Sequence, residues 1–311
     1  MTAYHRIVGL AACALALDGC ARSFVTTASE QTYLRAEHNW AFRERFPRAD
    51  RLLNAFDYGH AILYETLISA HDAPAAIDGP VFTRVTQQVL RHPPPVPLEE
   101  AAIGPDYVTL IPEVVATFEW AHMLHRQLYD VWAEQGLTRY QRDVEVHKLI
   151  AYYRSRPDLA LSTEPRSMEL MEGQPYSLAF RRQDPKYNGL LWSYHWFQMA
   201  LYDALMADRN DAKLHAAVDS VVGHFFAMVE NAPANMPADM PMSGDAAPRF
   251  AEAYPDAANI FDNLHSLHDV VSDILASPVV PRAQKRAAIL RAAAAYRNSL
   301  STDERTKTGH R

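Results

Sequence analysis

Apolar residues recur at helical spacing along most of the chain, and prolines and glycines divide this pattern into segments. The pattern predicts helices over residues 47–69, 81–91, 112–135, 138–156, 188–207, 211–231, 256–276 and 282–299, preceded by a helical stretch from about residue 30 to a break at Phe46-Pro47. Irregular connections are predicted over 71–80, 92–111 and 232–255, and mixed structure over 162–186. Because no segment alternates with the period of a strand, the predicted fold class is an all-α helical bundle with long irregular connections.

One short phrase occurs three times on the predicted helices: phenylalanine, an acid, two further residues and histidine. An acid and a histidine three positions apart share one face of a helix, because three steps of about 100° nearly close a turn. Helical bundles present metal ligands inward in this way. The predicted ligands in the three copies are Asp57 and His60; Glu119, His122 and His125; and Asp262, His265 and His268.

A fourth helix carries a weaker copy of the phrase, which ends at His195. When His195 is aligned with His122, both segments reach the sequence Leu-Tyr-Asp six residues later, and helix 47–69 carries a related Leu-Tyr-Glu at a different spacing. We therefore add His195 to the predicted ligands and expect the four helices to form four walls of one bundle. The tyrosines of these tripeptides, Tyr64, Tyr129 and Tyr202, are interpreted as core aromatics, with hydrogen bonding to the metal ligands as the alternative.

Three carboxylates and six histidines exceed the needs of one ion, so the sequence predicts a site for two metal ions. Mixed imidazole and carboxylate ligation favours iron, with zinc or manganese as alternatives. The Glu119/His122 and Asp262/His265 pairs resemble the Glu-x-x-His motif of ferritin-like di-iron proteins, and the excess of histidine resembles hemerythrin. This resemblance implies a dinuclear non-haem iron site inside a helical bundle.

The first 20 residues are predicted to be a signal peptide, because a positively charged start precedes an apolar stretch over residues 7–17. The following Leu17-Asp18-Gly19-Cys20 resembles the lipobox of bacterial lipoproteins. The resemblance implies that Cys20 is lipidated and anchors the protein to a membrane of the bacterial cell envelope; plain secretion is the alternative. Residues 21–30 are then a tether, 31–300 a single all-α metal-binding domain and 301–311 a polar tail. The two cysteines, Cys13 and Cys20, both lie in the leader, which excludes thiolate ligands from the domain.

Composition limits the function only broadly. The net charge of −7 and the scattered basic residues give no support for nucleic-acid binding. The motifs favour a dinuclear oxidoreductase that uses O₂ or peroxide. The alternatives are a lipoprotein that binds, stores or senses metal or O₂, a metal-dependent hydrolase suggested by the adjacent His268-Asp269, a bis-histidine haem protein and a purely structural domain. The substrate and the oligomeric state stay open.

Overall fold

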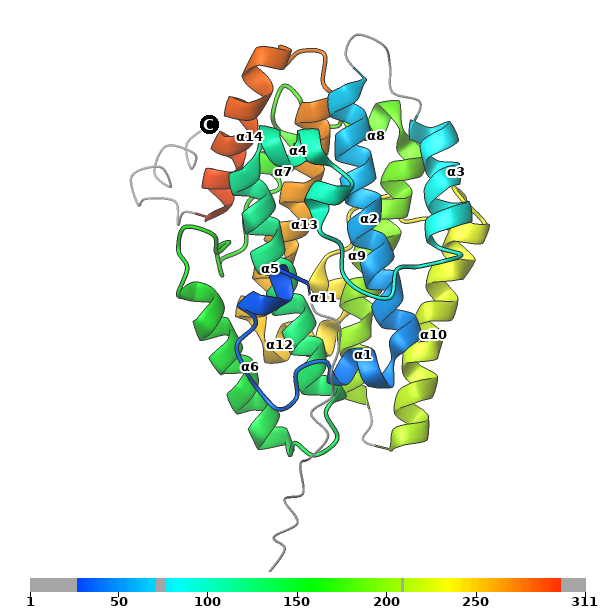
Figure 1. Cartoon of the computed structure of the whole chain (residues 1–311), viewed down its shortest axis with the longest axis vertical. Helices are drawn as coiled ribbons and strands as arrows, with labels where there is room; N and C mark the ends of the chain where they lie inside the picture. Colours follow the sequence, from blue (N-terminus) through cyan, green and yellow to red (C-terminus); the bar gives the residue numbers. More distant parts are fainter. Residues whose placement is uncertain (1–26, 71–76, 208–209, 298–311) are drawn as a thin grey trace, which may run out of the picture.

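The computed structural model describes residues 27–70, 77–207 and 210–297, and every regular element in these ranges is helical (Figure 1). The predicted all-α bundle is therefore confirmed. None of the helices in the described ranges has the length and hydropathy needed to cross a membrane. The predicted signal peptide, Cys20, most of the tether and the polar tail lie outside these ranges.

The helices form four consecutive units with one plan: a short turn, a short helix, a long helix that begins with proline, and a closing helix. The first unit contains η1 (Ser29–Thr32), α1 (Ala41–Arg45) and α2 (Pro47–Ser69), and it closes with η2 (Ile77–Val81), α3 (Phe82–Arg84) and η3 (Val85–Val89). The second contains η4 (Glu100–Ala102), α4 (Pro105–Leu110), α5 (Pro112–Ala133) and α6 (Arg139–Arg154). The third contains α7 (Glu169–Glu172), α8 (Ala179–Gln183), α9 (Pro185–Ala207) and α10 (Asp211–Glu230). The fourth contains α11 (Ser243–Ala246), α12 (Pro248–Ala253), α13 (Pro255–Ala276) and α14 (Arg282–Arg297).

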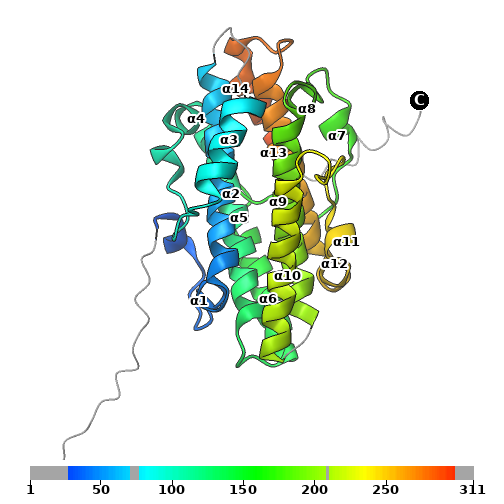
Figure 2. The same cartoon turned by 90° about the vertical axis from the view of Figure 1, so that its right-hand side faces the viewer.

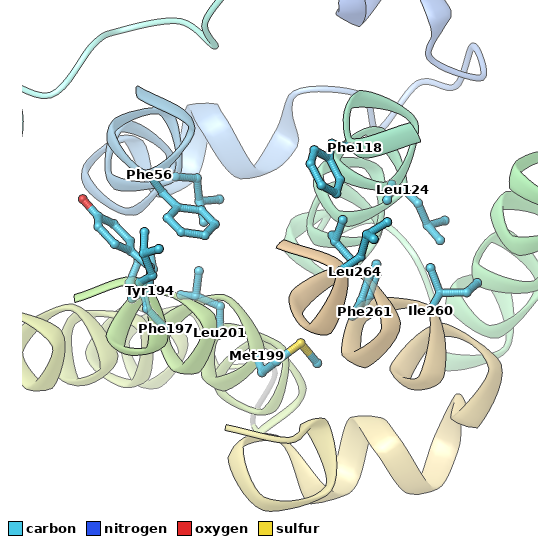
Figure 3. Close-up of a cluster of buried hydrophobic side chains, with 14 of the residues drawn as sticks. Phe56, Phe118, Leu124, Tyr194, Phe197, Met199, Leu201, Ile260, Phe261 and Leu264 are labelled. Carbon is cyan, nitrogen blue, oxygen red and sulfur yellow. The ribbon is translucent and has the colours of Figure 1, made fainter. Parts of the chain in front are cut away.

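The four long helices, α2, α5, α9 and α13, form the central bundle (Figures 1 and 2). Proline is favoured at the first helical position because its missing N–H would be unpaired there anyway. Helices α2 and α13 run in one direction and α5 and α9 in the other (Figure 1). Helices α2 and α5 each pack against both α9 and α13 through the pairs α2–α9, α2–α13, α5–α9 and α5–α13. Figure 3 shows Phe56, Phe118, Tyr194 and Phe261, one from each long helix, among the side chains that fill the core.

The starting prolines set a common register for the long helices. Ten positions after the proline stand Asp57, His122, His195 and His265, and thirteen positions after it stand His60, His125, Gln198 and His268. The alignment of His195 with His122 thus agrees with the structural register. The phrase beginning at Phe56 lies one turn further along its helix than the other two copies, so Asp57 corresponds to His122 and not to Glu119.

An acid eighteen positions after each proline ties one unit to another. The Asp130 carboxylate of α5 accepts hydrogen bonds from the backbone N–H of Trp40 (2.8 Å) and Phe42 (2.9 Å), at the start of α1. Asp273 of α13 accepts in the same way from Leu178 (2.8 Å) and Phe180 (2.9 Å), at the start of α8. Trp40 and Leu178 both adopt left-handed backbone conformations, with φ of 68° and 66°.

The other two units use the same link with the remaining acids. Glu65 of α2 accepts from the backbone N–H of Tyr107 in α4 at 3.0 Å, and Asp203 of α9 accepts from that of Phe250 in α12 at 2.9 Å. Each long helix therefore holds the short helix that precedes another long helix.

Several predicted boundaries are wrong for a physical reason. The stretch before Phe46 is helical only in η1 and α1. The predicted irregular connections 92–111 and 232–255 contain short helices: η4 and α4 in the first, α11 and α12 in the second. Residues 77–80, predicted as loop, belong to η2. Helix α9 begins at Pro185, three residues before its predicted start. The short helices α1, α4, α8 and α12 are stabilised by acids distant in sequence, which local pattern does not reveal.

Replacing Asp130 or Asp273 with alanine is expected to lower the free energy of unfolding by about 2–4 kcal/mol, because each change leaves two backbone N–H groups without their acceptor. Urea denaturation would measure the loss. Asp219→Ala, at an exposed position of α10, is the control and should cost less than about 0.5 kcal/mol. Equal stability of the Asp273 variant and the control would contradict the role of these links.

Candidate metal centre

The six histidines of the proline register meet in the core of the bundle. His60, His125, His195, His265 and His268 are at most 4% exposed, and the side chain of His122 is 12% exposed. They come from all four long helices: one from α2, two from α5, one from α9 and two from α13. The structure thus brings together every histidine that the sequence predicted as a ligand.

Three of these histidines form the tightest group. One ring nitrogen from each of His60, His195 and His268 lies within 4.8 Å of the other two. The Nδ1 atom of His268 is 2.9 Å from the Nε2 atom of His60. The ring of His195 lies 6.1 Å from that of His60 and 6.3 Å from that of His268, measured between centroids. We call His60, His195 and His268 the histidine triad.

The other three histidines border the triad. The ring of His265 stacks on that of His195 at a centroid distance of 4.0 Å and an interplanar angle of 9°. The ring of His122 lies 5.5 Å from that of His268, and the ring of His125 lies 6.0 Å from that of His265. The six imidazoles are therefore one continuous cluster that links the four helices.

Many ring nitrogens in this cluster have no hydrogen-bond partner among the described residues. They are Nδ1 of His60, Nε2 of His122, Nε2 of His125, both nitrogens of His195, Nδ1 of His265 and Nε2 of His268. A buried polar atom without a partner costs about 1–3 kcal/mol, so native cores usually avoid it. A metal ion bound by one nitrogen of each ring would remove part of that cost, which makes the unpaired atoms an argument for ligation.

Burial keeps these imidazoles in the form that binds metals. Removal from water lowers the pKa of His60, His195 and His268 well below its usual value, and the neighbouring histidines lower it further. Burial also lowers the pKa of His265 to about 3. At neutral pH each ring is uncharged, with one protonated nitrogen and one nitrogen that carries a lone pair. Between His268 Nδ1 and His60 Nε2 one nitrogen donates and the other accepts with its lone pair, so a metal bound there would replace that hydrogen bond.

Hydrogen bonds from neighbouring side chains orient part of the cluster. The amide oxygen of Gln198 lies 3.1 Å from Nε2 of His265, and because that oxygen can only accept, Nε2 carries the proton and Nδ1 is left with the lone pair. The Tyr202 hydroxyl lies 2.8 Å from Nδ1 of His125. The Tyr64 hydroxyl donates to the backbone oxygen of His268 at 3.2 Å. These tyrosines, which sequence reasoning took for core aromatics, therefore also hold the backbone or ring of a histidine.

The three predicted carboxylates occupy different surroundings. Asp57 stands between Arg126, whose Nη2 donates to its Oδ2 at 2.7 Å, and His122, whose Nδ1 lies 3.8 Å from its Oδ1. The Asp262 Oδ1 accepts from the backbone N–H and the hydroxyl of Ser243, at 2.8 and 2.6 Å. Asp57 thus adjoins the histidine cluster, whereas Asp262 fastens α11 to α13.

Glu119 lies at the edge of the cluster in a small cavity of about 30 Å³, which Asp57, Glu100 and His122 also line. Burial raises the pKa of the Glu119 carboxyl, with further contributions from Glu99 and Asp57. Burial raises the pKa of Glu100 even more, and the charges of Glu119 and Asp57 add to the effect. The cavity therefore gathers three carboxyl groups beside the most exposed histidine of the cluster.

Sequence reasoning missed two residues of this region. Gln198 occupies the same register position as His60, His125 and His268, and the common distance from the starting proline could have identified it. Glu100 belongs to the predicted irregular connection 92–111, where no pattern indicates what a side chain faces.

No protein-family model, curated protein or solved structure matches this chain. Its function must therefore be argued from the geometry of the histidine cluster.

The buried histidines should make the stability of the metal-free protein depend on pH. Their folded-state pKa values lie below the ordinary value near 6.5, so below that pH the unfolded chain binds more protons and the folded state loses stability. Each histidine contributes up to about 1.4 kcal/mol per pH unit in this range. The buried carboxyl groups whose pKa values are raised instead favour the folded state as the pH falls, so the test compares variants with the wild type. Between pH 7.5 and 5.5, His195→Phe should lose about 1.4 kcal/mol less free energy of unfolding than the wild type.

The measurement is urea denaturation with a chelator present. His147→Gln, at an exposed histidine of α6, is the matched control and should leave the pH dependence unchanged. Identical pH dependence of the wild type and the His195→Phe variant would show that His195 is not held neutral by burial.

Proposed function

We propose that this protein binds a first-row transition-metal ion through the histidine triad of His60, His195 and His268. The supporting observation is that ring nitrogens of these three buried histidines converge, within a cluster where several imidazole nitrogens have no hydrogen-bond partner among the described residues. Among the described residues, the triad is the group whose donor atoms all lie within 4.8 Å of one another. His122, His125 and His265 each have one buried, unpaired nitrogen, and they would have to move closer together to hold the second ion of the predicted dinuclear site.

The donor set favours copper or zinc for the triad ion. All three triad donors are imidazoles, which suit copper, zinc, nickel and iron, and no carboxylate belongs to the triad itself. A buried ion with neutral ligands keeps its full charge, and monovalent copper requires the least compensation. The iron predicted from the sequence would fit better beside Asp57 and Glu119, where an imidazole and carboxyl groups lie together.

Binding of the metal, for storage, delivery or sensing, is the role that the geometry favours over catalysis. Two cavities of about 1190 and 1070 Å³ could admit an organic substrate, but no histidine of the cluster lines either of them. The cavity at Glu119 and His122, of about 30 Å³, is large enough for a water molecule, an ion or a diatomic gas. An envelope location, which depends on the leader and Cys20, belongs to the same proposal.

The small cavity supports a second candidate, a dinuclear oxidoreductase that uses O₂ or peroxide. The cavity combines carboxyl groups with His122, whose ring lies 5.5 Å from that of the triad residue His268. When bound, two redox-active metal ions would each supply one electron to O₂. Asp57, Arg126 and Glu119 would position the reactant and supply a proton at its outer side.

The first test is metal content after the full chain has been loaded separately with copper, zinc and iron and freed of excess ion. We expect at least one ion per chain, and two if the outer histidines also bind. His60→Ala combined with His268→Ala should remove the triad ion, whereas His147→Ala should remove none. In the wild type, an ion present at a hundred times its Kd should raise the free energy of unfolding by about 2.7 kcal/mol.

Absence of metal from the wild type under all three loadings would overturn the proposal, as would unchanged metal content in the triad variant. Circular dichroism of each variant shows whether the bundle has kept its helices. Two ions in the wild type, one of them lost after His122→Ala, would favour the dinuclear candidate.

The acids of the small cavity should govern how fast the ion enters. Glu119 and Glu100 can release their protons to an incoming cation and offer it carboxylate oxygens on the way to His122, whose side chain is the most exposed of the cluster. Glu119→Gln with Glu100→Gln is therefore expected to slow metal uptake by roughly tenfold. The number of ions bound at equilibrium should stay the same. Stopped-flow mixing would measure the rate, with Asp219→Asn as the exposed control. Uptake at the wild-type rate in the double variant would mean that the ion enters elsewhere.

A further inference from the structure

A second region with the features of a binding site lies away from the histidines, between the start of α2, the closing segment of the first unit and the end of α10. A cavity of about 1190 Å³ opens there. Figure 2 shows α3 and α10, two of the helices that border it, on the side towards the viewer. Small-molecule sites in proteins typically occupy roughly 300–1,000 Å³, so the cavity can hold a ligand of substantial size.

The charge around this cavity opposes that of the whole chain. Arg48, Arg51, Arg91 and Lys186 line it, and Glu230 is the single acid among its described lining residues. The chain as a whole has a net charge of −7. Several cations gathered around one hollow repel one another and create a positive potential there, which an anion would relieve.

The walls beneath these cations are apolar. Leu52 and Leu90 are 1% and 3% exposed, and Phe82 is 6% exposed. The Lys186 ammonium group lies 4.0 Å from the centre of the Phe82 ring, and the Arg48 guanidinium lies 5.5 Å from the centre of the Phe226 ring. Two of the four cations, Lys186 and Arg48, are therefore held over aromatic rings that line the cavity, so one ligand can contact both positive charge and apolar surface.

The backbone of one wall is also unusual. The closing helices α6, α10 and α14 of the other three units are regular, whereas the first unit closes with π-helical turns at η2 and η3 on either side of α3. Such turns are rare and are frequently found at functional sites. Phe82, the residue after η2, and Leu90, the residue after η3, both line the cavity.

We infer that this cavity binds an anionic amphiphile, a molecule with a carboxylate or phosphate head and an aliphatic body. The head pairs with Arg48 and Arg51, in the first turns of α2, where the positive end of the helix dipole adds to the attraction. The body lies along Leu52, Phe82 and Leu90. This site does not depend on the metal proposal, because it shares no residue with the histidine cluster.

Calorimetric titration of the full chain with laurate, below its micelle concentration and at 0.15 M salt, tests the inference. We expect saturable binding of one laurate per chain, at least tenfold tighter than binding of the uncharged dodecanol. Arg48→Gln with Arg51→Gln should weaken laurate binding by roughly tenfold or more. Arg35→Gln with Arg154→Gln removes the same charge from exposed positions of the chain and should leave binding unchanged.

A second experiment distinguishes binding of a single amphiphile molecule from binding to a membrane surface. The same variants are mixed with vesicles of phosphatidylglycerol and of phosphatidylcholine. Binding of laurate and of the anionic phospholipid, both lost in the Arg48/Arg51 variant, supports a site for the shared head-group chemistry. Overturning results are the absence of saturable laurate binding, equal affinity for dodecanol, equal binding by the Arg48/Arg51 and control variants, or binding to anionic vesicles without binding of laurate.

Discussion

The burial of uncharged imidazoles, several of whose nitrogens have no hydrogen-bond partner among the described residues, is the constraint on which the rest of the structure depends. A core made only of hydrocarbon would avoid the cost of those polar nitrogens. This bundle instead places them at the centre of all four long helices. Aromatic rings cover the cluster: the centroid of the Phe118 ring lies 3.9 Å from that of His268, and the centroid of the Phe261 ring lies 3.5 Å from that of His125. The arrangement keeps the imidazoles neutral and gathers them in one place.

The fourfold repeat of one helical unit provides the scaffold for this centre. Each unit contributes a long helix to the core and an acid that accepts hydrogen bonds from a short helix of another unit. The short helix of each unit is therefore stabilised by a different unit. Repeats of this kind become stable by covering one another. The units have diverged where they meet the core: Asp57 and Gln198 stand at positions that histidine occupies in other units. The first unit, which carries Asp57 beside the small cavity, also has the irregular closing segment.

The long helices and their inward histidines could be predicted from sequence because both depend on local information: starting prolines, helical spacing and a repeated phrase. What could not be predicted depends on contacts between distant segments. The short helices α4 and α12 look like proline-rich loops until Glu65 and Asp203 are seen to hold them. Likewise, Asp262 matches Glu119 in sequence, but Ser243 engages it, whereas Glu119 lines a cavity with Glu100. Only the packing of the connections separates these two acids.

The common distance from proline to histidine has a consequence for how such a chain can change. One residue inserted between Pro185 and His195 would turn the imidazole by about 100° around the helix and shift it by about 1.5 Å, out of reach of its neighbours. An insertion between units leaves that distance untouched, and the varied lengths of the connections show that such changes fit the fold. Related chains should therefore preserve the ten-residue count within each long helix even where the identity of the residues around it has drifted.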